Sequence, residues 1–278
     1  MVKFSSFERN LVKEKKLCKV CPLFSGSEGN STYVKIKNTS FLIDAGRSCK
    51  QIENSIIKNG FNPNDIKFIF VTHEHSDHVK GIRVLAKKFG IKIYASKGTI
   101  SELKNKDILD KEIEYEVIER SGINIDNINI IPFETSHDCT QGYGYTFFIN
   151  EKKLKISFCS DLGIVSNEVL NSILGSNLIF MESNHDVDML KNGPYPWYLK
   201  QRILSDIGHL SNNACSEVLN KLILNGTKKF VLCHLSSTNN TPEIAYNSVF
   251  KVLENTGIKD FELYVAPKEN IGKININI

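Results

Sequence analysis

The sequence lacks any apolar run close to the roughly 18 residues that a transmembrane helix requires, so we predict no contact with membranes. Its opening, "MVKFSSFERNLVKEKKLC", is polar and rich in lysine, and it contains no apolar stretch of the kind found in secretory signals. We therefore predict a cytoplasmic protein. Residues 1–17 are predicted to form a flexible extension, and residues 18–278 a single domain.

The sequence also lacks a linker rich in proline, glycine or serine, and it has no internal repeat. Its 278 residues, of which 41% are hydrophobic, are enough to bury a large core. The net charge of +4 permits a polyanionic partner without requiring one.

The seven cysteines are odd in number, and their spacing is not that of a disulfide framework. Cys18 and Cys21 form a single C-x-x-C pair. A zinc or redox role for this pair competes with the simpler interpretation that all the thiols are reduced, as in a cytosolic protein.

Short runs of β-branched and aromatic residues predict strands in both halves of the chain. Helices are predicted at 48–59, 79–89 and 242–255, with a helical region at 195–225, and the last strand is predicted near 261–265. This pattern favours an α/β fold in which two sheets pack face to face with helices outside. In such folds, ligands bind where loops converge beyond the strand ends.

The stretch "VTHEHSDHVKG", residues 71–81, follows an apolar run and carries several metal-capable side chains. They are His73, His75, Asp77 and His78. Residues two apart in a tight loop can point the same way, so one loop can offer two ligands to each of two cations. The competing interpretation is a solvated polar loop at a helix start, with Asp77 as an N-cap residue.

Three further apolar runs also end near a metal-capable residue, namely His137, Asp161 and His234. A histidine such as His137 or His234, taken alone, is more often a structural residue. Together with the 71–81 loop, they predict a site for divalent cations that accept imidazole and carboxylate ligands.

These motifs resemble those of the metallo-β-lactamase superfamily. "FLIDAG" with Asp44, "THEHSDH", "ETSHD", "SDLG" and "CHLS" arrive in the order that the superfamily shows. The longer stretches "LFSGSEGNSTYV", "ESNHD", "SDIGHLSNNA" and "HLSSTNNTPE" are most similar to the small YycJ/WalJ-type exonucleases. The resemblance implies an αββα sandwich of two packed mixed β-sheets with helices on the outer faces.

The resemblance also implies two metal sites that share one carboxylate, Asp161. The first would comprise His73, His75, His137 and Asp161. The second would comprise Asp77, His78, Asp161 and His234. The expected cofactors are two divalent ions, Zn²⁺ or Mn²⁺, and Fe²⁺ also accepts these ligands.

The implied activity is that of a metal-dependent phosphodiesterase, a 5′-to-3′ DNA exonuclease that uses a hydroxide activated by two metal ions. Asp77 is expected to accept a proton from the attacking water. His209, just before a predicted helix that Ser211 caps, is expected to bind the scissile phosphate or protonate the leaving oxygen. His185 is a further catalytic candidate. For both histidines, a purely structural role is the alternative.

Residues 25–31, "SGSEGNS", form a turn whose backbone amides can face a phosphate, and it can equally be an ordinary hairpin loop. Its substrate-binding candidates are Ser25, Ser27 and Asn30, which join His209 and Ser211. The aromatic stretch 195–198, "YPWY", either stacks a base or packs in the core.

Three basic side chains lie close in sequence to residues 71–81, which we call the metal loop: Arg47, Lys80 and Arg83. They either contact a nucleic-acid backbone or are solvated.

Other activities of the same fold stay open. The interval from Asp161 to His234 is too short for the inserted domain of the large RNA-cleaving relatives, although a small RNA-processing nuclease fits. A thioesterase or lactonase is the alternative from a different reaction class. The oligomeric state cannot be predicted from these residues.

Overall fold

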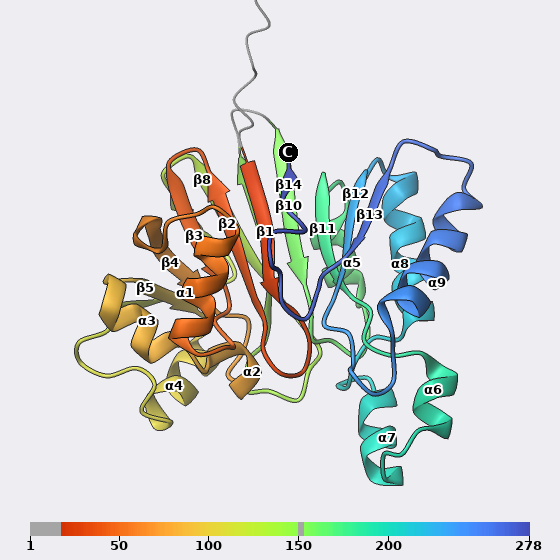
Figure 1. The fold of residues 1–278 in the computed structure, drawn as a ribbon, viewed down its shortest axis with the longest axis horizontal. Helices are drawn as coiled ribbons and strands as arrows, with labels where there is room; N and C mark the ends of the chain where they lie inside the picture. The colour runs from red at the N-terminus through yellow and green to blue at the C-terminus, as the bar shows by residue number, and fades with distance from the viewer. Residues whose placement is uncertain (1–17, 150–152) are drawn as a thin grey trace, which may run out of the picture.

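The computed structural model describes residues 18–149 and 153–278, so the predicted extension at 1–17 lies outside the described residues. Two seven-stranded mixed sheets pack face to face, and helices cover both outer faces (Figure 1). The predicted αββα sandwich is confirmed. The assignment of 18–278 to one domain stays a prediction.

The first sheet has the order β14-β1-β2-β3-β4-β5-β6. Its strands are β1 (Cys18–Phe24), β2 (Ser31–Ile36), β3 (Thr39–Ile43), β4 (Ile66–Phe70), β5 (Lys92–Ala95), β6 (Tyr115–Val117) and β14 (Ile276–Asn277). Pairing is antiparallel from β14 to β3 and parallel from β3 to β6.

The second sheet has the order β13-β12-β11-β10-β9-β8-β7. Its strands are β7 (Ile123–Ile125), β8 (Ile128–Glu134), β9 (Tyr143–Ile149), β10 (Leu154–Cys159), β11 (Leu178–Glu182), β12 (Lys229–Cys233) and β13 (Glu262–Val265). Pairing is antiparallel from β7 to β10 and parallel from β10 to β13.

The helices fall into groups along the chain. Those of the first half are α1 (Cys49–Lys58), the 3₁₀ turn η1 (Pro63–Asp65), α2 (Ser76–Val79), α3 (Ile82–Phe89) and α4 (Lys97–Asn105). Those of the second half are α5 (Asn167–Ile173), α6 (Val187–Asn192), α7 (Trp197–Leu204), α8 (Asn212–Leu224) and α9 (Pro242–Glu254).

The core forms three layers, one between the sheets and one under each set of helices. Between the sheets, Phe41 of β3 stacks on Phe147 of β9 with ring centroids 4.8 Å apart. The ring of Phe70 at the end of β4 meets Tyr145 edge-on at 5.8 Å. Large aromatic side chains bury much apolar area. They therefore hold β4, whose end carries the metal loop, firmly against the second sheet.

Local sequence explains where several helices begin. Ser48 accepts a hydrogen bond from the backbone N–H of Gln51 and completes a capping box at the start of α1. Ser211 caps α8 through the N–H of Ala214, which confirms it as the N-cap residue. Thr241 caps α9 in the same way, with Pro242 at the first helical position.

The structure differs from the sequence-based prediction in several elements. The helix predicted at 79–89 corresponds to α3, which begins three residues later at Ile82, after the separate short helix α2. Helices α4, α5 and α6 were not predicted, because their short segments carry weak periodicity. The strand at 261–265 is not the last one, because β14 follows and pairs with β1 through Val20 and Ile276.

The C-x-x-C pair lies on strand β1, where alternate residues face opposite sides of the sheet. Cys18 packs in the layer between the sheets, and Cys21 packs under the helices. Burial raises the pKa of both thiols to about 12. The two sulfurs therefore cannot bind one zinc ion, and the interpretation as reduced structural thiols holds.

Among the described residues, no helix has both the length and the apolar character needed to cross a membrane.

Candidate metal centre

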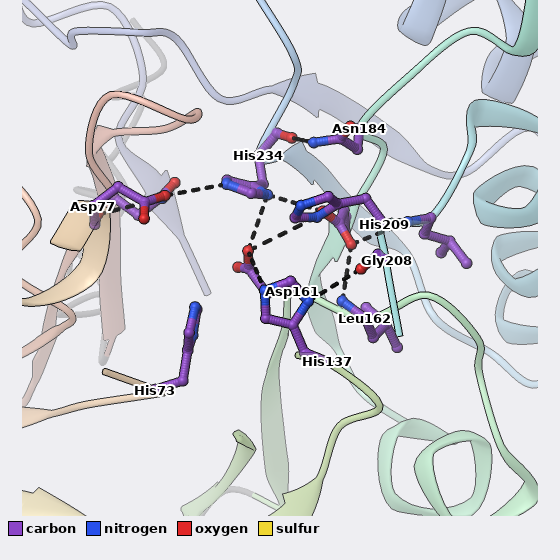
Figure 2. A network of polar contacts seen from close by, with 12 residues as sticks. His73, Asp77, His137, Asp161, Leu162, Asn184, Gly208, His209 and His234 are labelled. Atoms are coloured by element: carbon purple, nitrogen blue, oxygen red, sulfur yellow. Dashed lines mark hydrogen bonds and ion pairs between the residues drawn. The ribbon is translucent and has the colours of Figure 1, made fainter. Parts of the chain in front are cut away.

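The metal-capable residues gather where the strands of both sheets end (Figure 2). The loop from His73 to His78 follows β4 in the first sheet. His137 follows β8, Asp161 follows β10 and His234 follows β12, all in the second sheet. The packing of the two sheets thus brings together side chains that are far apart in sequence.

The side chains form two groups joined by a shared carboxylate. Ligand-capable atoms of His73, His75 and His137 lie within 4.8 Å of one another, as do those of Asp77, His78 and His234. The ligand-capable atoms of Asp161, His73 and His78 also lie within 4.8 Å of one another. A further group joins Asp161 and His234 to Glu182 and His209. The structure therefore brings together all seven residues predicted as metal ligands, and their division between two cations stays a prediction.

Three residues of the site have a left-handed backbone conformation that non-glycine residues rarely adopt. The φ angles of Asp44, Asp161 and His234 are 58°, 57° and 55°. Each residue comes within two positions of a strand end, so this conformation turns the chain sharply at the rim of the sheet. It costs on the order of 1–3 kcal/mol per residue, which the surrounding contacts must offset.

Buried ligand atoms without partners indicate that the centre suits cations. Among residues 18–149 and 153–278, His73 Nε2 and Asp161 Oδ2 are buried and have no hydrogen-bond partner. Buried polar atoms are normally hydrogen-bonded. A divalent cation that accepts imidazole and carboxylate ligands would satisfy both atoms.

Asp44 fixes the orientation of His78 from behind. Its Oδ2 lies 2.8 Å from His78 Nδ1, while Oδ1 accepts the backbone N–H of Thr72 at 2.8 Å. The Thr72 hydroxyl also donates to Oδ2. With its proton on Nδ1, the imidazole presents Nε2 as an acceptor toward the centre, as metal-binding histidines require.

Glu182, the last residue of β11, orients histidine rings in the second sheet as Asp44 does in the first. Its Oε1 lies 2.8 Å from Nδ1 of both His209 and His234. Its Oε2 accepts the backbone N–H groups of Leu162 and Leu210 at 3.0 and 3.2 Å. Glu182 is not among the predicted site residues, although an acidic residue that closes the buried strand "LIFME" is a signal in the sequence.

His137 is held by a backbone acceptor. Its Nδ1 lies 3.1 Å from the carbonyl oxygen of Gly208, which directs the other ring nitrogen toward the centre. Figure 2 shows this contact and the Asn184 side chain, which donates to the His234 carbonyl at 2.9 Å. The ligand rings are thus oriented by groups behind them.

The centre concentrates negative charge. Burial favours the neutral form of Asp77, but His78 and His234 outweigh it and hold the pKa of this carboxyl well below its usual range. Burial opposes charge on His234 as well, yet Asp161 and the bonds to Asp77 and Glu182 raise its pKa to about 10. These carboxylates require nearby positive charge, which bound cations would supply in exchange for protons.

The structure separates the two candidate catalytic histidines. The ring of His209 lies 5.0 Å from that of His137 and 5.2 Å from that of His234, at the edge of the centre. His185 is 1% exposed, and neither ring nitrogen has a hydrogen-bond partner among the described residues. Burial lowers its pKa to about 4. Its backbone forms a β-bridge with Ser211, and it belongs to none of the metal-capable groups.

The turn at 25–31 contacts the centre mainly through two residues. Ser25 accepts the backbone N–H of His234 at 2.8 Å. Asn30 Nδ2 lies 3.2 Å from Asp77 Oδ2 and 3.0 Å from His78 Nε2. These contacts give Ser25 and Asn30 positioning roles, and their binding of substrate stays a prediction. Ser27 is exposed.

Gly46, from the "FLIDAG" motif, allows the metal loop to pack closely. A Cβ at this position would lie 1.6 Å from the Asp77 carbonyl oxygen. The Asn30 backbone N–H donates to the same oxygen at 2.7 Å. A side chain here would displace the loop, so glycine is required by the close approach of the backbones.

Two of the cations near the loop are already paired. Arg47 binds Glu28 and lies over the Phe24 ring, and Arg83 binds Asp110. Lys80 is exposed.

With this geometry in view, comparison with known proteins identifies the family. The sequence profile of the β-lactamase superfamily domain matches residues 39–235. The chain belongs to the metallo-β-lactamase superfamily. The matched range includes every predicted metal ligand of this superfamily member.

The similar proteins include two curated enzymes and a solved structure. The chain is 40% identical to exodeoxyribonuclease YycJ of Bacillus anthracis, over 84% of this chain and 89% of that protein. It is 36% identical to exodeoxyribonuclease WalJ of Streptococcus pneumoniae, over 87% and 91% respectively. The metallo-β-lactamase fold protein YhfI of Bacillus subtilis superposes with a TM-score of 0.69 at 14% identity, covering 91% of this chain and 98% of YhfI. YhfI supports the fold alone.

Replacing Asp44 with asparagine is expected to weaken metal binding without unfolding the chain. The amide keeps the shape of the side chain but cannot act as a charged acceptor for His78 Nδ1 and both Thr72 donors. Loss of such an outer partner typically lowers metal affinity about 10- to 100-fold. Competition with a chromophoric chelator measures this affinity for Zn²⁺. Asp65→Asn, a surface change beside Lys35, is the control, and unchanged affinity in Asp44→Asn would contradict the assigned role.

Proposed function

We propose that the chain is a metal-dependent phosphodiesterase that degrades DNA from an end. The observation that carries this proposal is the pair of three-residue ligand groups joined by Asp161. It is supported by identities of 40% and 36% to two proteins named exodeoxyribonucleases, over most of their lengths. The 5′-to-3′ direction is carried over from the resemblance.

Two divalent cations are proposed, held by the ligands that the sequence suggested. His73, His75 and His137 would hold the first, Asp77, His78 and His234 the second, and Asp161 would contact both. When bound, such a pair lowers the pKa of a water molecule and neutralises charge on the attacked phosphoryl group. Zn²⁺ and Mn²⁺ are the proposed ions, and Fe²⁺ fits the same donors.

The chain's own residues supply proton transfer. Asp77, a proposed ligand of the second cation, is also proposed to accept the proton of the attacking water. His209 is proposed to protonate the leaving oxygen. Glu182 Oε1, 2.8 Å from Nδ1, orients the ring, which leaves Nε2 as the atom that would carry the transferred proton. A role for His185 in this step stays a prediction with less support, because that ring is buried outside the ligand groups.

DNA is the preferred substrate class because of the relatives' names, with a small RNA-processing activity as the alternative. A thioesterase or lactonase activity is less favoured. The two curated relatives that match over most of their length carry exodeoxyribonuclease names. A DNA substrate also agrees with the cytoplasmic location predicted from the sequence.

A substrate panel tests the proposal. Protein loaded with Mn²⁺ or Zn²⁺ is offered end-labelled single- and double-stranded DNA, RNA of matching sequence, and a thioester. We expect stepwise release of mononucleotides from DNA, with a label on the 5′ end released first. Thioester turnover without nuclease activity would overturn the proposal, and preferential cleavage of RNA would favour the alternative.

A further inference from the structure

Helix α7 is unusually exposed and carries two large aromatic side chains. Trp197 is 72% exposed and Tyr198 is 75% exposed, and none of the eight residues of α7 is buried. The core-packing interpretation of 195–198 is therefore wrong for these two side chains. Figure 1 shows α7 beyond the strand ends, at the same end of the molecule as α2 of the metal loop.

Three further exposed apolar residues lie at the end of α7 or in segments close to the metal centre. We call this surface the apolar rim: Ile164, Trp197, Tyr198, Leu204 and Ile207, each more than 40% exposed. Solvent exposure of several large apolar side chains in one region marks an interaction site.

Hydrogen bonds attach the apolar rim to both sides of His137. The backbone N–H of Asp138 donates to the carbonyl of Ile207 at 3.2 Å. The hydroxyl of Ser136 donates to the carbonyl of Ile164 at 3.1 Å. Residues 136–138 therefore lie between Ile164 and Ile207, whose side chains are exposed.

The segment that follows α7 ties the apolar rim to His209 as well. The His209 backbone N–H donates to the carbonyl of Ile203, inside α7, at 3.0 Å. Arg202 of α7 forms an ion pair with Asp138. This pair neutralises the acidic residue beside His137 that would otherwise repel a phosphate.

We infer that the apolar rim is a stacking surface for unpaired bases of the DNA strand whose end lies in the metal centre. This inference rests on the proposed function. The proposed path takes a strand from a terminal phosphodiester near His137 and His209 over the apolar rim, because hydrogen bonds link that surface to the segments that carry both histidines. Exposed aromatic side chains stack on bases of any sequence, which suits an enzyme that removes successive nucleotides.

Trp197 is the only tryptophan of the chain, so its fluorescence reports directly on this surface. The full chain, loaded with Zn²⁺, is titrated with a single-stranded phosphorothioate oligodeoxyadenylate that resists hydrolysis. We expect quenching of the emission on binding, and much weaker quenching with the same sequence in a blunt duplex. Equal quenching by both forms, or none, would overturn the inference. Emission that instead depends on protein concentration without DNA would assign the surface to contact between two copies of the chain and also overturn it.

Kinetics on a long and a small substrate separate this inference from the proposed function. In Trp197→Ala/Tyr198→Ala, KM for single-stranded DNA is expected to rise about tenfold to a hundredfold, because each lost base–aromatic contact weakens binding by roughly tenfold. Hydrolysis of bis(4-nitrophenyl) phosphate, which is too small to reach α7, is expected to stay unchanged. The rise in KM is expected to be similar at low and high salt, since stacking is not a phosphate contact.

Two control variants make the result specific. Trp197→Phe keeps a stacking ring and is expected to restore most of the affinity. Tyr115→Ala removes another exposed aromatic residue, on β6, and is expected to change nothing. If the wild-type protein degrades DNA and the double variant has an unchanged KM, only the inferred stacking surface is overturned. A wild-type protein that hydrolyses no DNA would overturn the proposed function together with it.

Discussion

Replacing Asp161 with asparagine is expected to abolish DNA hydrolysis, with a loss of more than about a thousandfold in kcat. Ligand-capable atoms of Asp161, His73 and His78 lie within 4.8 Å of one another, and Asp161 Oδ2 is buried without a hydrogen-bond partner among the described residues. It is the only proposed ligand shared by the two groups. Its loss is therefore expected to lower the bound metal from two ions to one or none.

Asparagine is the informative substitution because it tolerates the left-handed backbone at this position, where φ is 57°. The variant thus removes the charge without adding backbone strain. Metal content by mass spectrometry of the intact protein and single-turnover assays give the result. Asp260→Asn, an exposed change beside Lys228, is the matched control and should keep both ions and full activity. An Asp161→Asn protein with two ions and normal turnover would refute the shared ligand.

Replacing His209 with alanine is expected to lower kcat about 10²- to 10⁴-fold while leaving the metal content unchanged. His209 is proposed to donate a proton to the leaving oxygen, supported by Glu182 at 2.8 Å. A substrate with a 4-nitrophenolate leaving group needs little protonation. The loss should therefore be much smaller on bis(4-nitrophenyl) phosphate than on DNA.

This dependence on the leaving group distinguishes proton donation from mere positioning. Equal losses on both substrates, or a loss of metal, would contradict the assignment of His209 as the acid. Glu182→Gln is expected to show the same pattern but to lower metal affinity too, because Glu182 also bonds His234. His185→Ala tests the other histidine, and a loss of kcat as large as that of His209→Ala would support a catalytic role for His185.

Much of the fold followed from local patterns in the sequence. Strand β8 shows why, since its buried Ile128 and Ile130 alternate with partly exposed neighbours, which is the two-residue period of a strand. The capping role of Ser211 was equally local. Strand β14 escaped prediction because two residues carry no periodicity, and only their pairing with Lys19 and Val20 makes them a strand.

In the site, too, some features follow from local sequence and others appear only in the folded chain. The residues from His73 to His78 are close in sequence, so their spacing alone indicated metal chemistry. Glu182 escaped because its role depends on His209 and His234, which reach it only when β11 and β12 pair and α7 folds back. Asn30 was expected to bind substrate, but its contacts to Asp77 and His78 became visible only in the folded chain.

The sequence by itself determined which side chains can bind cations and that they stand at the ends of buried strands, because ligand chemistry and strand periodicity are properties of neighbouring residues. The tertiary structure decided how these side chains group, which carboxylates orient them, and that Trp197 lies in solvent instead of in the core. Those outcomes depend on packing between segments far apart along the chain, and no local pattern records such contacts.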